Sequence, residues 1–207
     1  MIRISRFLRG LPALVVLSLA IGLSFPPRSA QAHEFVVELR ATGAEREAIL
    51  TDALRGFLVA TAERDGHADE TSNGHLGGLD VYIVPRPAGV AARFPDLRDA
   101  PSDRPDITLV IGPPDEVAAE VEAIGDETLA VPQGALDPAN RWNVAEDQDP
   151  AGFAARYVAA FGQPPSRWSA QGYNAARIDA AIRPLGGVDD GAALHRALAD
   201  SAQGLRW

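Results

Sequence analysis

The stretch that decides the fold is Ile107-Thr108-Leu109-Val110-Ile111, which is followed by Gly112-Pro113-Pro114. Unbroken runs of β-prone residues are typical of parallel strands that are covered on both faces, so residues 106–111 predict such a strand. The glycine and the two prolines end it. Residues 116–124 then predict a helix, with Asp115 as its N-cap.

Strands and helices alternate along the rest of the chain. Side chains in residues 34–42 alternate between two faces as in a strand, whereas residues 44–64 repeat apolar side chains at helical spacing. Two more strands are predicted at 79–84, stopped by Pro85 and Pro87, and at 128–131. Three more helices are predicted at 151–161, 169–182 and 191–201, the last capped by Asp189 or Asp190. The alternation predicts an α/β fold: an open, mostly parallel sheet with flanking helices and a helical C-terminal part.

Residues 1–32 have the layout of a cleavable secretory signal. Arginines at positions 3, 6 and 9 precede an apolar run over residues 11–24, and Ser29-Ala30-Gln31-Ala32 supplies the small residues that a signal peptidase reads. The run is shorter than the roughly 20 residues of a membrane span. We therefore expect cleavage after Ala32, a single domain over residues 33–207, and a soluble periplasmic protein that is not inserted in the membrane.

The composition narrows the possible partners and sites. There is no cysteine, which excludes disulfides, thiolate metal sites and cysteine nucleophiles. The formal net charge is −9, and losing the four arginines of residues 1–32, which contain no acid, makes it −13. So acidic a chain repels phosphates, which argues against nucleic acid and anionic membranes as partners.

The C-terminal helices carry a pattern of aromatic and small residues. It consists of Phe153, Arg156-Tyr157, Phe161-Gly162, Pro165 and Gly172-Tyr173-Asn174-Ala175-Ala176. This pattern resembles the type I periplasmic solute-binding proteins of ABC importers, the leucine/isoleucine/valine-binding group, and weaker similarity covers residues 56–66, 77–81 and 106–113. The role of the pattern is packing: the aromatic rings would anchor one helix, and Tyr173 would open the next with its ring inward.

The resemblance implies a shortened member of that family, with the fold of one periplasmic-binding-protein lobe. Family ligands lie in a cleft between two lobes, and this chain is too short for both. Members that bind amino acids carry Ser or Thr just after the Gly-Pro turn, where this chain has Pro114, Asp115 and Glu116. Asp115 and Glu116 would repel a carboxylate and accept a cationic or hydroxyl-bearing solute.

A second candidate ligand platform lies in the irregular segment 134–150. Arg141 and Trp142, followed by Asn143, would hold a ligand by stacking and cation attraction. The alternative is a tryptophan that fills the edge of the core.

Metal ligands are a further possibility. His67 and His75 lie with Asp69 and Glu70 in a polar loop over residues 65–78, and imidazole with carboxylate is a donor set for divalent metals. The spacing matches no metal signature, and a solvated loop is the simpler interpretation. His33, once N-terminal, would chelate copper through its amine and its imidazole. We expect no cofactor and no bound metal.

The sequence contains no recognisable catalytic arrangement. It has no Gly-x-Ser-x-Gly elbow, no histidine in a triad order and no phosphate-binding glycine loop. We therefore expect a protein that is not an enzyme, and three functions stay open. The first is a periplasmic solute-binding protein that carries a small polar ligand to an ABC permease or another membrane or periplasmic protein. The second is a degenerate half-size relative that acts as an accessory subunit without a ligand. The third is a copper- or metal-handling protein that uses His33.

Overall fold

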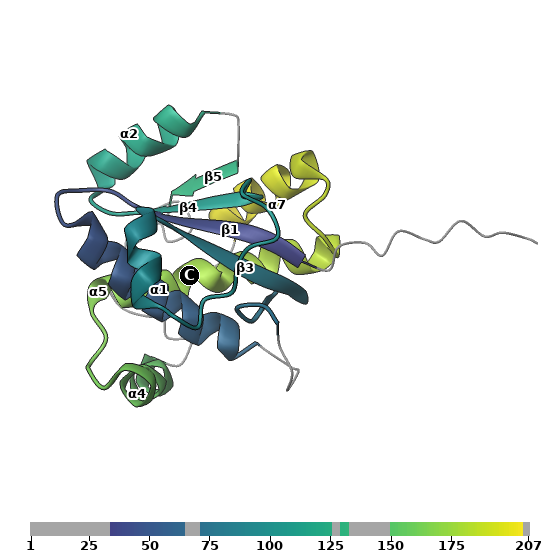
Figure 1. Cartoon of the computed structure of the whole chain (residues 1–207). Helices are drawn as coiled ribbons and strands as arrows, with labels where there is room; N and C mark the ends of the chain where they lie inside the picture. The colour runs from purple at the N-terminus through teal and green to yellow at the C-terminus, as the bar shows by residue number, and fades with distance from the viewer. Residues whose placement is uncertain (1–33, 65–70, 126–128, 133–149, 205–207) are drawn as a thin grey trace, which may run out of the picture. The chain divides into compact units, whose positions relative to one another are not determined.

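The structure is a computed structural model and describes residues 34–64, 71–125, 129–132 and 150–204. A five-stranded sheet in the order β2-β3-β1-β4-β5 forms its centre (Figure 1). Four of these strands are parallel, and the short β2 runs antiparallel to β3, so the sheet is mixed. The strands are β1 (Glu34–Ala41), β2 (His75–Leu76), β3 (Leu79–Arg86), β4 (Ile107–Ile111) and β5 (Leu129–Pro132).

Both faces of the central strands are covered. Phe35, Val37 and Leu39 of β1 belong to the main hydrophobic core and are at most 1 % exposed. Glu38 and Arg40 alternate with them and point to the opposite face of the sheet. β4 is buried along its whole length, as its unbroken apolar run predicts.

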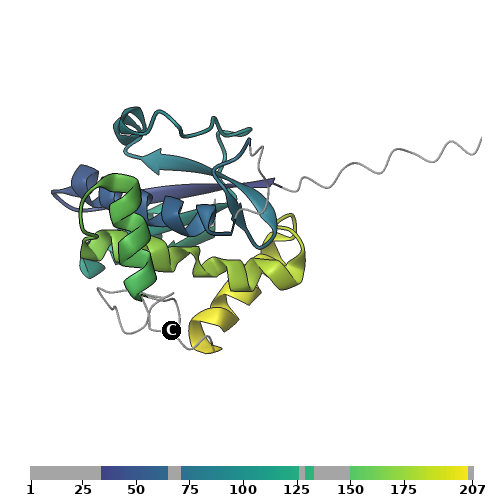
Figure 2. The ribbon, with the colours of Figure 1, turned by 90° about the horizontal axis from the view of Figure 1, so that it is seen from below.

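Helices form a layer on each side of the sheet. α1 (Arg46–Ala62), α4 (Pro150–Phe161) and α5 (Arg167–Ala175) lie on the side of the main core, and α2 (Pro114–Ile124) lies on the other side (Figure 1). Figure 2, seen from below, shows α4, α5 and the C-terminal helices together in the lower part of the picture, next to the strands. This arrangement confirms the predicted α/β class with flanking helices. None of the helices in these segments is long and apolar enough to cross a membrane.

The aromatic pattern of the C-terminal part packs as predicted. Phe153, Tyr157 and Tyr173 are at most 3 % exposed, and the rings of Phe153 and Tyr173 have centroids 4.4 Å apart. Tyr173 does not open its helix, however. α5 begins at Arg167, with the hydroxyl of Ser166 as its N-cap, because that oxygen can accept the free amides of the first turn.

The C-terminal helices need one correction. The predicted single helix over 169–182 is wrong, because α5 ends at Ala175 and 3-10 turns (Ala176–Ile178 and Arg183–Leu185) flank the short α6 (Asp179–Ile182). A tertiary contact accompanies the break: Asp179 Oδ1 accepts the amide of Gly77 at 2.6 Å, between β2 and β3. α7 (Gly191–Gly204) is capped as predicted, since Asp190 Oδ1 accepts the Ala193 amide at 2.9 Å.

Three predictions next to the sheet are wrong. β3 continues through Pro85 to Arg86, because β2 pairs only with its first two residues and an edge tolerates a residue without N–H. Asp115 is not the N-cap of α2, which begins at Pro114 because the fixed φ of proline suits a first helical position. The described end of the loop 65–78 is not solvated: Ser72, Asn73 and His75 are at most 9 % exposed.

Candidate functional site

The order in which the chain adds strands to the sheet reverses between β1 and β4. From β1 it passes through α1 to β3 on one side, and from β4 it passes through α2 to β5 on the other. α1 and α2 therefore leave the same end of two neighbouring parallel strands toward opposite faces. Open α/β sheets bind their ligands in the crevice at such a switch point, beyond the carboxyl ends of the strands.

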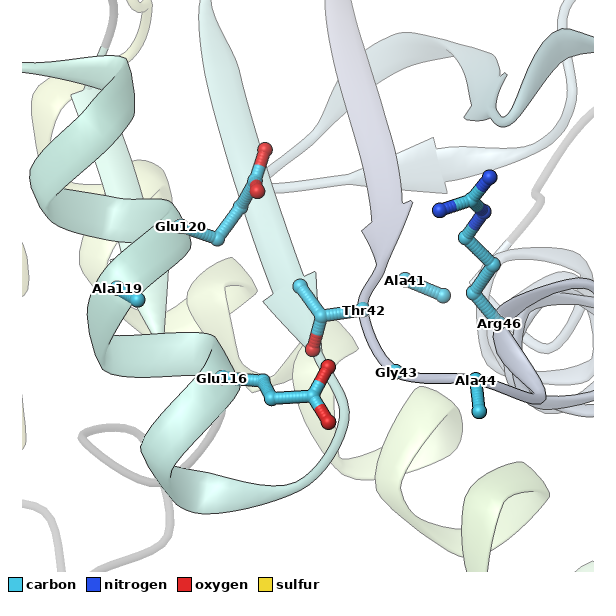
Figure 3. A pocket seen from close by; sticks show the side chains of 8 residues that line it. All are labelled: Ala41, Thr42, Gly43, Ala44, Arg46, Glu116, Ala119 and Glu120. Carbon is cyan, nitrogen blue, oxygen red and sulfur yellow. The ribbon is translucent and has the colours of Figure 1, made fainter.

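A pocket of about 520 Å³ lies at this point (Figure 3). The connection from β1 to α1 forms one wall, and α2 forms the other. The lining residues are Ala41, Thr42, Gly43, Ala44, Arg46, Glu116, Ala119 and Glu120. The three residues from α2 share one helix face because they lie three or four positions apart. Pockets for small solutes have volumes of about 300–1,000 Å³.

Two charged side chains of the pocket have no ion-pair partner among the residues that the structure describes. Figure 3 shows Glu116 extending from α2 toward Gly43, and Arg46 extending from the start of α1 on the other wall. Within the segments that the structure describes, neither makes an ion pair or a side-chain hydrogen bond. Glu116 Oε2 lies 3.5 Å from the point that a Cβ on Gly43 would occupy. The pocket thus offers one carboxylate and one guanidinium to a solute.

Thr42 belongs to the wall formed by the β1–α1 connection, and its hydroxyl has no partner among the described residues. Thr42 is 8 % exposed, and among the described residues its buried Oγ1 finds no hydrogen-bond partner. A Cβ on Gly112 would lie only 2.1 Å from this oxygen, so the glycine makes room for it. In Figure 3 the hydroxyl turns toward the side of the pocket that holds Glu116. A buried hydroxyl left without a partner costs about 1–3 kcal/mol, which a hydrogen bond from a bound molecule would recover.

Glu120, the second carboxylate of the pocket, is paired. Arg40 Nη1 lies 2.7 Å from Glu120 Oε1, and Arg40 Nε lies 2.6 Å from Glu38 Oε1. Glu38 is only 4 % exposed and also accepts Arg86 Nε at 3.3 Å. Burial lowers the pKa of Arg40, but the hydrogen bond to Glu120 and the charge of Glu38 outweigh burial and raise the pKa above its ordinary value. Arg40 therefore stays charged and neutralises Glu120.

The residues predicted to bind ligand fall into three groups. Asp115 and Glu116 are both exposed in the first turn of α2, but only Glu116 lines the pocket. Successive helix residues project about 100° apart, which explains the difference. Arg141 and Trp142 lie outside the described residues.

The candidate metal ligands do not form a cluster in the described part of the chain. His33 and His67 lie outside the described residues. His75 is buried in β2, and its Nε2 lies 2.9 Å from Asp80 Oδ1 in β3. No group of three or more potential metal ligands occurs within residues 34–64, 71–125, 129–132 and 150–204.

Sequence reasoning missed Thr42, Arg46 and Glu120. The signal that would have found the first two is position: Thr42 ends a predicted strand and Gly43 follows it, just as Ile111 ends a predicted strand and Gly112 follows it. Applying the rule for carboxyl ends to both strands would have joined the two loops in one site. Glu120 could have been predicted from Glu116, because it lies one helical turn further along the same face of the helix.

Comparisons with protein-family models, with curated proteins and with solved structures found no match.

Proposed function

We propose that this chain is a binding module for a small polar solute and not an enzyme. The solute lies beyond the carboxyl ends of β1 and β4, between the β1–α1 connection and α2, where the Glu116 carboxylate takes a cationic or hydroxyl-bearing group. Arg46 takes a carbonyl or anionic group on the other wall, and the Thr42 hydroxyl gains a partner. The observation that carries the proposal is a pocket at the switch point of an open α/β sheet, with polar groups that have no partner among the described residues.

The same proposal includes export. The signal-like segment 1–32 and the similarity of the C-terminal helices to type I solute-binding proteins support a periplasmic protein that hands its solute to an ABC permease or another membrane or periplasmic partner. The strand order fits one lobe of such a protein, because its four parallel strands form a doubly wound sheet.

The accessory-subunit alternative requires an exposed apolar patch where a second lobe would pack. At the carboxyl ends of β1 and β4 the described wall is instead polar, with Thr42, Arg46 and two glutamates. The exposed large hydrophobic residues of the described segments are Val158 on α4 and Leu185 after α6, and neither lines the crevice. The charge of the crevice therefore favours a solute over an apolar partner surface. Copper binding through His33 stays a prediction.

The experiment is a thermal-shift screen of the purified protein with amines, amino alcohols, polyols and sugars, followed by calorimetric titration of each hit. Glu116→Gln should weaken binding of an amine by about ten- to a hundredfold, because a charge-assisted hydrogen bond contributes about 1.5–3 kcal/mol and a decade in affinity is about 1.4 kcal/mol. Asp115→Asn is the matched control, since it removes a neighbouring acid that does not line the pocket.

Two outcomes would contradict the proposal. If no solute shifts the melting temperature across the whole screen, the accessory-subunit function is the better interpretation. If a solute binds and Glu116→Gln changes its affinity no more than Asp115→Asn does, the solute lies elsewhere than in this pocket.

A further inference from the structure

We propose that Arg40 sets the charge selectivity of the pocket: by neutralising Glu120, it makes the pocket accept a solute with one cationic group and discriminate against a solute with two. This inference rests on the proposed function, which is the binding of a polar solute at Glu116. It assigns to Arg40 the role of a positioning residue, because Arg40 does not line the pocket and acts through Glu120.

The spacing of the two glutamates makes this role possible. Glu116 and Glu120 lie four residues apart on α2, and such residues have Cβ atoms about 5–6 Å apart on the same helix face. Two free carboxylates at this distance would bind both ends of a short diamine. Of the two, Glu116 alone lacks a partner within the described segments, because Arg40 Nη1 donates to Glu120 Oε1 at 2.7 Å.

Buried Glu38 fixes the position of the Arg40 side chain. Arg40 projects from the central strand β1, and its Nε lies 2.6 Å from the carboxylate of Glu38 on the same strand. The Glu38 side chain is 5 % exposed, and Arg86 of the neighbouring strand also bonds it. Two arginines and two glutamates thus balance one another, and the network adds no net charge to the pocket. What remains in the pocket is one carboxylate and the Arg46 guanidinium.

The proposal is tested with two probes of matched length, 4-aminobutan-1-ol and 1,4-diaminobutane, titrated calorimetrically into the full chain and its variants. The measured quantity is the ratio of the diamine dissociation constant to the amino-alcohol dissociation constant. Arg40→Gln frees Glu120, so this ratio should fall by about tenfold, the effect of one added charge-assisted hydrogen bond. Glu120→Gln leaves Arg40 and Arg86 with Glu38 as their shared counter-ion, so the network gains one net positive charge beside the pocket and the ratio should rise.

Two further variants separate selectivity from folding. The double variant Arg40→Gln/Glu120→Gln removes both charges and should return the ratio to that of the unchanged protein. Arg86→Gln also removes a cation from Glu38, but Glu120 keeps its bond to Arg40, so the ratio should change far less than in Arg40→Gln. If Arg40→Gln does not fold, the rise expected in Glu120→Gln, which changes a partly exposed side chain, still tests the proposal.

Each outcome has one meaning. A ratio that falls in Arg40→Gln, rises in Glu120→Gln and recovers in the double variant supports the proposal. Binding of the probes with an unchanged ratio in Glu120→Gln overturns it and leaves the proposed function standing. If neither probe binds the unchanged protein or any variant, both the selectivity and an amine-binding pocket are wrong.

Discussion

Gly172 of α5 lies directly against Ala53 of α1: a Cβ on the glycine would stand 2.0 Å from the carbonyl oxygen of Ala53. On the other side of the same crossing, a Cβ on Gly56 would stand 1.9 Å from the carbonyl oxygen of Ser169. Two glycines thus let the two helices touch through their backbones. α1 packs on the sheet, so this contact fixes the position of α5 beside it.

Gly172→Ala should destabilise the protein by about 3 kcal/mol or more, because the added methyl group overlaps backbone that cannot move without separating the helices. Urea unfolding followed by circular dichroism measures the change. Gly191→Ala is the matched control in a helix, since a Cβ there meets no atom within 4 Å. It should be neutral or slightly stabilising, because alanine favours a helix by about 1 kcal/mol over glycine. Equal effects of the two changes would contradict the packing role of Gly172.

The stability of the α1–α4–α5 contact should fall at alkaline pH. Glu63 Oε2 accepts the hydroxyl of Tyr173 at 2.6 Å, and Glu63 also pairs with Arg156 of α4. Burial raises the pKa of Tyr173, and its hydrogen bond to Glu63 and the charge of Glu63 raise it further. The side chain of tyrosine in an unfolded chain has a pKa of about 10. The folded pKa is the higher one, so the stabilisation is complete below about pH 10 and is lost as the pH rises through the folded pKa.

Tyr173→Phe tests this pH dependence. The variant should be less stable than the unchanged protein at neutral pH, and its unfolding free energy should fall less steeply above about pH 10. Denaturant unfolding at several pH values gives both quantities. Tyr82→Phe, which changes a tyrosine on β3, should keep the slope of the unchanged protein. An alkaline slope that is identical in all three proteins would exclude Tyr173 as its source.

The fold follows from local patterns wherever burial is complete. Residues 107–111 and the alternating residues of β1 predict their strands because each side chain meets the core or the opposite layer. The errors arise where a contact with a residue far away in the sequence determines where a helix or strand ends. Asp179 bonds the Gly77 amide across 102 positions of sequence, and no local pattern signals that α5 should end before it. Pro85 stays in β3 because β2 pairs only with Leu79 and Asp80, so no strand needs a backbone N–H from Pro85 on that edge.

Glu38→Gln should destabilise the protein by about 1.5–3 kcal/mol, because Arg40 and Arg86 lose their charge-assisted hydrogen bonds to a buried carboxylate. Glu116→Gln is the matched control, as Glu116 makes no ion pair within the described segments, and it should change stability by no more than about 0.5 kcal/mol. Thermal unfolding of the three proteins in the same buffer measures the difference. A neutral Glu38→Gln would show that the carboxylate does not hold the two arginines in solution.

The candidate site is less predictable than the fold because its two walls come from separate parts of the chain. Glu116 is predicted from the Gly-Pro turn that precedes it, but its counterpart Arg46 lies 70 residues earlier and carries no motif. The pairing of Glu120 depends on Arg40, which points to the second face of β1, and sequence alone does not show that α2 covers this face. Charge and hydroxyl groups at strand ends can be predicted, whereas their pairing cannot.

Thr42→Val should separate stability from binding. Valine has nearly the shape of threonine, and the hydroxyl it replaces is buried without a partner among the described residues. Removing such a group should stabilise the unliganded protein, by about 1 kcal/mol or somewhat more. If the hydroxyl takes its hydrogen bond from the solute, the same change should weaken solute binding by about tenfold. Thermal unfolding without solute and calorimetric titration with a hit from the solute screen give the two numbers.

Thr51→Val is the matched control, because the Thr51 hydroxyl already bonds the Glu47 carbonyl oxygen at 2.6 Å on α1, away from the pocket lining. That control should lose stability and keep its affinity. A Thr42→Val protein that is more stable and binds as tightly as before would show that Thr42 has no role in the pocket.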